Sequence, residues 1–212
     1  MPPPARGRPR SFDRDVAVDR AVRLFWRKGY EATSVRDLSD ELGIGMPSLY
    51  NAFGGKRALF AEAVTVYDRK YGAFIEAALD EEPTATLAIR RILAEAPARY
   101  TRRGLPRGCL VAGGDAGTDD GQVRTALARR REEKVRQLAR KIDADVVAGR
   151  LPADTDAAAL AGYVMAVLSG LVQRARDGAS RGELERIAAV TAAGLTTRRE
   201  AGRRRRSAAT PR

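Results

Sequence analysis

Small, polar and cationic side chains are concentrated between Thr33 and Lys56, where they could bond to an anionic partner. Ser34 and Asp37 have the spacing of a capping box, so a helix should begin at Val35. Lys56 follows two glycines at another helix start, where its ammonium and the free backbone N–H groups suit a phosphate oxygen. Thr33 and Ser34 would act in the same way at the preceding helix start. The segment therefore predicts a phosphate-binding surface.

Two short helices joined by a glycine turn should carry these residues. Apolar residues recur on one face of residues 35–42, and Gly43 should end that helix. Proline at Pro47 is compatible with the first turn of the next helix, because its missing N–H has no intrahelical partner there. This is the layout of a helix-turn-helix, whose second helix enters the major groove with its first turn nearest the bases. The residues expected to contact DNA are Thr33, Ser34, Arg36, Gly45, Met46, Pro47, Ser48, Tyr50, Asn51 and Lys56.

At these residues the chain resembles the tetracycline-repressor-type (TetR/AcrR) family of regulators, over residues 10 to 70. The resemblance includes the segments LFWRKGYEATSVRDLSDELGIG and SLYNAFGGKRALF. Met46 and Pro47 stand where many relatives carry polar or small residues, a departure that concerns base preference and not the fold. Beyond residue 75 only the helix layout is similar. The first helix of the resemblance has Ala17, Ala21, Leu24 and Phe25 on its inner face.

The resemblance implies an all-α fold of about nine helices, with a three-helix helix-turn-helix domain followed by a helical ligand-binding and dimerisation domain. It also implies a homodimer that represses transcription from a palindromic DNA operator until an unknown small-molecule effector releases it. A DNA-binding regulator without ligand control, either architectural or constitutive, is the alternative. The expected organisation is a basic disordered arm (1–10), the helix-turn-helix domain (11–57), the effector domain (58–197) and a basic disordered tail (198–212).

The composition removes most enzyme chemistries. The 212 residues include no histidine and one cysteine, so zinc sites of the Cys/His kind, histidine-based catalysis and an internal disulfide are excluded. We expect no enzymatic activity, no metal and no cofactor. The chain has no signal-peptide pattern and no apolar run near twenty residues, so we expect a cytoplasmic protein that does not span a membrane. The carboxylates expected to cap helices or face solvent are Asp115, Asp119, Asp120, Asp143 and Asp145.

Positive charge is concentrated at the two ends of the chain. The net charge is +12, and residues 198–212 carry 7 Lys and Arg against 1 Asp and Glu. Residues 1–72 carry 13 against 9, whereas residues 73–197 carry 19 against 17. Neutralised phosphates release counterions, so the basic ends favour DNA binding. The arm arginines Arg6, Arg8 and Arg10 are expected to reach a minor groove, while Arg203–Arg206 form either a solvated tail or an auxiliary nucleic-acid contact.

The chain from Arg57 onward is predicted to be helical. One long helix should run from Arg57 to about Leu79 and connect the two domains. A helix over residues 84–100 should be broken by Pro97 or by the turn at residues 103–106. A short helix around Cys109, a charged helix over 122–148 and two final helices should follow. The glycines Gly113, Gly114 and Gly117 follow no strand, so they should end a helix and not bind a nucleotide.

The last two helices are expected to form a four-helix dimer interface with a second copy. The first is apolar around much of its circumference, so it must bury more than one face. The alternative is that both helices complete the core of one chain. The residues expected at the interface are Leu160, Val164, Val167, Leu168, Leu171, Leu184, Ile187 and Thr191.

A ligand pocket is expected among the helices of the second domain, lined by apolar and aromatic side chains with a few polar groups. Cys109 lies near Arg103 and Arg107, which could depress the pKa of its thiol and make it a sensor of oxidants or electrophiles. The alternative is a small buried apolar residue. The candidate pocket residues are Phe74, Tyr100, Leu110, Tyr163 and Gln173.

Overall fold

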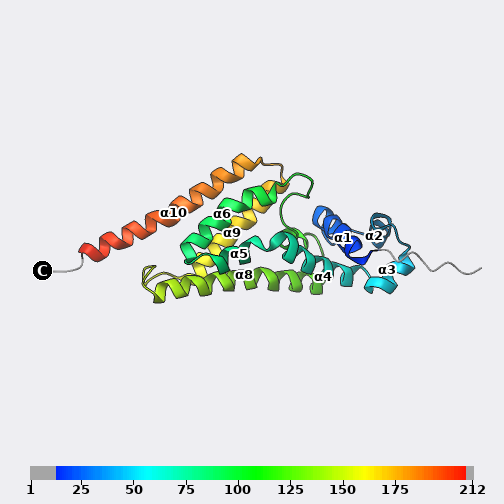
Figure 1. Cartoon of the computed structure of the whole chain (residues 1–212), viewed down its shortest axis with the longest axis horizontal. Coiled ribbons are helices and arrows are strands. Elements are labelled where there is room, and N and C mark those ends of the chain that lie inside the picture. The colour runs from blue at the N-terminus through cyan, green and yellow to red at the C-terminus, as the bar shows by residue number, and fades with distance from the viewer. Residues whose placement is uncertain (1–12, 209–212) are drawn as a thin grey trace, which may run out of the picture.

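The computed structural model describes residues 13–208, with side chains described for residues 13–194. The predicted arm residues Arg6, Arg8 and Arg10 lie outside the described residues. Every regular element in the described range is a helix, as the fold prediction required. Figure 1 shows an elongated molecule with a small helical head at one end and a larger helical bundle, the effector domain, at the other. The head contains α1 (Arg14–Lys28), α2 (Val35–Leu42) and α3 (Met46–Phe53).

The local signals at α2 and α3 are confirmed. Ser34 accepts a hydrogen bond from the N–H of Asp37, and the Asp37 carboxylate accepts one from the N–H of Ser34, which completes the capping box. Gly43 ends α2 in the left-handed conformation at φ 69°, which glycine adopts at little cost. Pro47 lies in the first turn of α3. The sequence signals at both helix ends therefore match the observed boundaries.

Aromatic side chains form the core of the head and join it to α4 (Lys56–Tyr67). The ring centroid of Phe25 lies 5.0 Å from that of Phe60 in an edge-to-face arrangement, a favoured geometry for aromatic pairs. Trp26 packs in the same way on Tyr67, with centroids 4.8 Å apart. Both pairs connect α1 to α4, so the head is packed firmly on the helix that leads to the effector domain.

The connecting segment is not the single long helix that the periodicity predicts. After α4, residues Asp68–Gly72 form a π-helix, and α5 then covers Phe74–Glu81. Arg130 of the effector domain pairs with Asp68 and donates a hydrogen bond to Thr65 at 3.0 Å. These tertiary contacts lie where the α-helical pattern of backbone hydrogen bonds ends and the π-helix begins. π turns of this kind often occur at functional positions in helices.

The effector domain consists of α5 and five further helices. Most of them pack around one apolar core, while the buried residues of α7 and of the first part of α8 join the apolar core of the head. Pro97 does not break α6, which continues to Tyr100, and Asp156 caps α9. α10 runs on to Ala208, so the predicted disordered tail is helical through that residue. The Arg, Ala and Glu residues of this tail favour helix formation. The five helices are α6 (Ala85–Tyr100), α7 (Leu110–Gly113), α8 (Gly121–Val147), α9 (Ala157–Arg176) and α10 (Arg181–Ala208).

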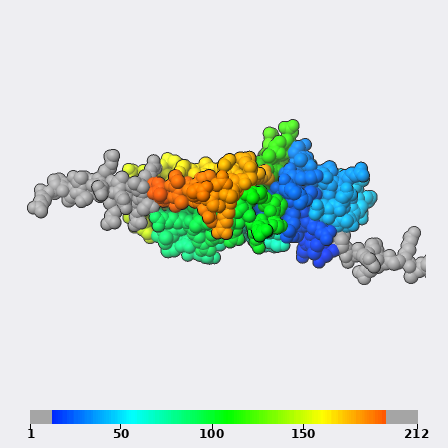
Figure 2. Space-filling view, turned by 90° about the horizontal axis from the view of Figure 1, so that it is seen from above, coloured from blue at the N-terminus to red at the C-terminus, as the bar shows by residue number. Residues whose placement is uncertain are grey.

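Within the described range, α9 alone has the length and composition of a membrane span, with a mean hydropathy of 1.3. This was not expected from the sequence. The helix packs against α6, α8 and α10, and Ala161, Val164 and Leu171 are completely buried in the effector core. An apolar helix in the middle of a bundle meets the same composition test. Figure 2 shows α10, in orange, lying along the outside of the bundle next to α9.

Candidate DNA-binding surface and effector pocket

The first turn of α3 forms an exposed surface on the head. Met46 is 51% exposed and Tyr50 is 53% exposed, and Pro47, Ser48 and Asn51 are also exposed. The N-cap of α3 is Gly45, which offers no side chain to bond the first backbone N–H groups. An exposed helix start with small residues is the geometry that major-groove contact requires. Six of the ten predicted residues thus lie together: Gly45, Met46, Pro47, Ser48, Tyr50 and Asn51.

A second helix start on the head, that of α4, is also uncapped. Gly55 provides no side-chain hydrogen bond to it. The Nζ atom of Lys56 lies 4.1 Å from the centre of the Tyr30 ring and 3.5 Å from the carbonyl oxygen of Glu31. Partial burial lowers the pKa of Lys56. The ammonium therefore rests partly on the head in this conformation, and only part of it is exposed for a phosphate.

Thr33 does not provide the side-chain contact predicted for it. The residue is fully buried, and its hydroxyl donates a hydrogen bond to the carbonyl oxygen of Gly29 at 2.6 Å. Ser34 is exposed, but its hydroxyl is engaged with Asp37 in the capping box. Both hydroxyls stabilise the turn before α2. The sequence could not separate this structural role from phosphate contact, since a capping residue suits both.

Three exposed arginines of α1, α2 and α4 form no ion pair with a carboxylate among the described residues. They are Arg20, Arg36 and Arg57, whereas Arg27 and Lys28 pair with Glu41 and Asp37. Unpaired cations on an exposed face suit phosphate oxygens. The list of predicted contacts includes Arg36 but omits Arg57. The signal that could have identified Arg57 is its position next to Lys56, in the first turn of α4.

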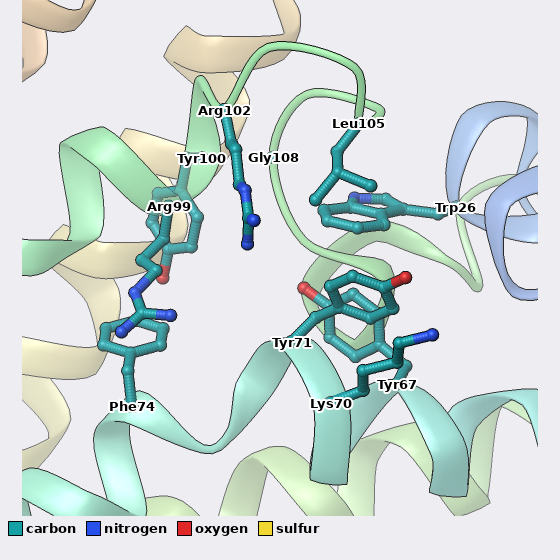
Figure 3. Close-up of a pocket in the computed structure, with 10 residues that line it drawn as sticks. All are labelled: Trp26, Tyr67, Lys70, Tyr71, Phe74, Arg99, Tyr100, Arg102, Leu105 and Gly108. Atoms are coloured by element: carbon teal, nitrogen blue, oxygen red, sulfur yellow. The ribbon is translucent and has the colours of Figure 1, made fainter. Parts of the chain in front are cut away.

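A small pocket lies at the junction of the head and the effector domain. Its volume is about 20 Å³ in this conformation, which is room for about one water molecule. Figure 3 shows aromatic rings from α1, α4 and α6 around it, with Arg102 reaching in from the loop after α6. The lining residues are Trp26, Tyr67, Lys70, Tyr71, Phe74, Arg99, Tyr100, Arg102, Leu105 and Gly108.

Two of the five predicted pocket residues, Phe74 and Tyr100, line this pocket. Leu110 is fully buried in the apolar core of the head. Tyr163 is 51% exposed and Gln173 is also exposed, so both lie on the outside of α9 and were wrongly placed. Helical periodicity identifies apolar positions but does not say which of them face a neighbouring helix and which face outward.

Most of the residues predicted at the dimer interface are buried within the chain's own core. They leave no surface for a second copy, because α6 and α8 cover that face of α9 and α6 covers the inner face of α10. The outer faces of these two helices expose Ile187, which is one of the predicted interface residues, together with Tyr163 and Val190, the last at 75%. Leu160 and Val167 are partly buried. The predicted interface residues that belong to the core are Val164, Leu168, Leu171, Leu184 and Thr191.

Cys109 is not an activated thiol in this structure. Burial raises the pKa of the thiol, although the Tyr67 hydroxyl opposes the rise through a hydrogen bond. Arg107 does not face it as a counter-ion, since its guanidinium donates to the carbonyl oxygens of Ala175 and Ala179. A raised pKa leaves less thiolate at neutral pH, and thiolate is the reactive form. The structure therefore favours the apolar role for Cys109.

Three of the five candidate carboxylates have structural partners, and the other two, Asp119 and Asp143, are exposed as expected. Asp120 caps α8 by accepting hydrogen bonds from Gln122 and Val123, and Asp115 pairs with Arg131 at 2.9 Å. Asp145 is buried and is the exception to the expected exposure, because it accepts hydrogen bonds from the N–H of Ala85 and from Arg150. In the part of the chain that the structure describes, no group of three or more potential ligands could hold a metal ion.

Comparisons with known proteins cover both domains. The profile of bacterial regulatory proteins of the tetR family matches residues 17–63, and that of the tetracyclin repressor-like C-terminal domain matches residues 85–193. The HTH-type transcriptional repressor ComR of Escherichia coli K12 is 34% identical over 190 residues, which cover 88% of this chain and 90% of ComR. The repressor BdcR of the same strain is 32% identical over 191 residues, covering 90% and 93%.

A solved structure provides a similar fold with DNA bound. It is a cysteine mutant of the TetR family transcriptional regulator CifR in complex with 26-bp double-strand operator DNA, with a TM-score of 0.82 and 38% identity. The alignment covers 88% of this chain and 98% of CifR. With its exposed α3, its uncapped helix starts and both domains matched by the family profiles, the chain belongs to the tetR family of bacterial transcriptional regulators.

Proposed function

We propose that the protein represses transcription as a homodimer on a pseudo-palindromic operator, from which a small-molecule effector releases it. The observation that carries the DNA part is the exposed face of α3, which presents Met46 and Ser48 at an uncapped helix start and Tyr50 about one turn further on. Arg36 and Arg57 are exposed cations that form no ion pair among the described residues. ComR and BdcR, whose alignments cover 88% and 90% of this chain, are repressors by name. This function places the protein in the cytoplasm, with the DNA.

Dimerisation is proposed to use the outer faces of α9 and α10. Ile187 and Val190 are one turn apart on α10, and Tyr163 is exposed on α9. Exposed apolar residues grouped on neighbouring helices commonly mark a protein interface. A two-fold dimer would present two copies of α3 to two half-sites about one DNA turn apart. The test is sedimentation of the free protein, in which a monomer at micromolar concentration would count against the proposal.

Selection of bound duplexes from a random pool tests the operator directly. We expect an enriched pseudo-palindrome, and fluorescence anisotropy with that duplex should show affinity falling steeply as salt rises, because phosphate contacts release counterions. A protein that enriches no sequence at physiological salt, or whose binding does not respond to salt, would contradict the proposal.

A regulator without effector control is the second candidate, and the small volume of the junction pocket, about 20 Å³, favours it. An effector that binds in this pocket requires it to open. A second cavity of about 340 Å³ between α6 and α10, lined by Leu93, Pro97 and Ala188 among others, already has room for a small molecule. Thermal melting across a panel of small molecules separates the two candidates, since a ligand that binds the folded state raises the melting temperature. The effector-controlled reading requires at least one compound that both raises it and releases the operator.

A further inference from the structure

We propose that the pocket between the head and the effector domain binds an aromatic carboxylate. The inference rests on the proposed function, since it names the chemical class of the effector and the site that takes it. Three features of the pocket lead to this class: aromatic walls, an unpaired guanidinium and a buried indole N–H without an acceptor.

The walls of the pocket are two groups of aromatic rings. Trp26 lies 4.8 Å from Tyr67 and 5.4 Å from Tyr71, measured between ring centroids. On the other side, Phe74 and Tyr100 are 6.2 Å apart in an edge-to-face arrangement. Figure 3 shows the pocket between these groups, with Arg102 extending into the gap. A planar ring placed there would meet aromatic faces and edges, the contacts that aromatic ligands prefer.

The charges of the lining favour an anion. Three cations and no carboxylate line the pocket. Lys70 pairs with Asp19 at 2.6 Å and Arg99 with Glu95 at 2.8 Å. Arg102 is exposed and forms no side-chain hydrogen bond or ion pair among the described residues. Guanidinium binds carboxylate through two parallel hydrogen bonds, so Arg102 provides the position for the acid group.

Trp26 provides a second, independent donor. The residue is 2% exposed, and its Nε1 atom is buried without a hydrogen-bond partner in the described part of the chain. Figure 3 shows the ring nitrogen on the edge of the indole that lies beneath Leu105. A buried donor without an acceptor is unfavourable, and an acceptor oxygen in the pocket would remove that cost. A carboxylate has two oxygens, so Arg102 and Trp26 can both bond to one acid group.

The segment between Tyr100 and Cys109 must move outward to admit a ring. Its tip is held by two long hydrogen bonds, from Arg23 to the carbonyl oxygen of Gly104 at 3.4 Å and from the N–H of Leu105 to the carbonyl oxygen of Arg102 at 3.3 Å, and by the packing of Leu105 on the core of the head. Because Trp26 belongs to the head and Arg102 follows α6, a ligand bonded to both would tie the two domains together. Differential binding of this kind is what couples an effector to the DNA-binding state.

Fluorescence of Trp26 tests the proposal, since Trp26 is the only tryptophan of the chain. The probes are benzoate, its neutral counterpart benzamide, and cyclohexanecarboxylate, titrated into the full-length protein with excitation at the red edge of the indole band. We expect a saturable change with benzoate, and at least about tenfold weaker binding of each of the other two. Equal affinity for benzoate and benzamide, or no saturable change with benzoate, would overturn the inference.

Two variants assign the contacts. Arg102→Gln should weaken benzoate binding about tenfold or more, whereas Arg103→Gln, which removes a neighbouring exposed charge outside the pocket, should leave it unchanged. Trp26→Phe keeps a ring but lacks the N–H, so calorimetry should show several-fold weaker binding. If Arg102→Gln and Arg103→Gln have equal effects, the guanidinium has no specific role and the inference fails. A protein that binds the operator but not benzoate would overturn this inference and leave the proposed function standing. Protein that binds benzoate but no duplex counts against the proposed function.

Discussion

The ring of Tyr50 lies against Gly55, at the point where the α3 and α4 segments of the head meet. A Cβ atom at Gly55 would lie 3.1 Å from Cε1 of Tyr50, and Gly55 itself has a φ of +109°, which side chains rarely allow. Tyr50 is 53% exposed on the proposed DNA surface. One glycine therefore sets the position of the Tyr50 ring and shapes the uncapped start of α4.

The variant Gly55→Ala should lose both stability and DNA binding. The positive φ and the contact with Tyr50 are each unfavourable for alanine, so we expect the free energy of unfolding to fall by about 1–3 kcal/mol. Displacement of Tyr50 should also weaken operator binding. Urea denaturation and anisotropy measure the two effects. Gly121→Ala is the control. A Cβ atom at Gly121 would have no neighbouring atom within 4 Å, and Gly121 has no positive φ, so this variant should keep wild-type stability. Equal stabilities of the two variants would contradict the argument.

The variant Arg36→Ala should weaken binding to all duplexes about equally. Its guanidinium is exposed and without a carboxylate partner among the described residues, so it is suited to phosphate contact, and its loss should lower the salt dependence by about one counterion. Arg27→Ala is the matched control, because Glu41 already offsets that charge at 3.4 Å. A change of base preference in Arg36→Ala, with total affinity intact, would mean that Arg36 contacts bases.

The head could be predicted closely because its signals are local. The capping box at Ser34 and Asp37, the left-handed Gly43 and the early Pro47 each depend on neighbours within one or two turns. The π-helix over residues 68–72 is contacted through Asp68 by Arg130, which is 62 residues away. No local pattern shows such a contact, and the sequence therefore predicted one continuous helix.

The pocket and the interface were harder to predict for the same reason. Apolar periodicity correctly selected Phe74 and Tyr100 but missed Trp26 and Arg102, since these come from the head and from a loop. On α9 and α10 the apolar residues that recur at helical spacing, such as Leu168 and Leu184, belong to the core of the effector domain. The residues left for a partner, such as Val190, are recognised only when the burial of each face is known.

Cys109 should react slowly in the native protein. Burial raises the pKa of its thiol, so the thiolate fraction at pH 7 is smaller than in the unfolded chain. We expect modification by a chromogenic disulfide reagent to be at least about tenfold slower in the native protein than in urea. The rate should rise with pH above neutrality in the native protein as thiolate forms. A native rate equal to or above the unfolded rate would restore the sensor hypothesis for this residue.

The variant Val190→Glu should produce monomers that retain their fold. Val190 is 75% exposed in one chain, so glutamate is hydrated in the monomer, but a symmetric interface would bury it opposite an apolar surface without a counter-charge. Sedimentation should show a monomer with native helix content and with operator binding reduced by at least about tenfold. Val147→Glu is the control. Val147 is 89% exposed at the end of α8, so this variant protein should remain dimeric. Leu168→Glu differs from both variants, because Leu168 is 2% exposed and a buried carboxylate should unfold the effector domain. Dimers that persist in Val190→Glu would place the interface away from this face of α10.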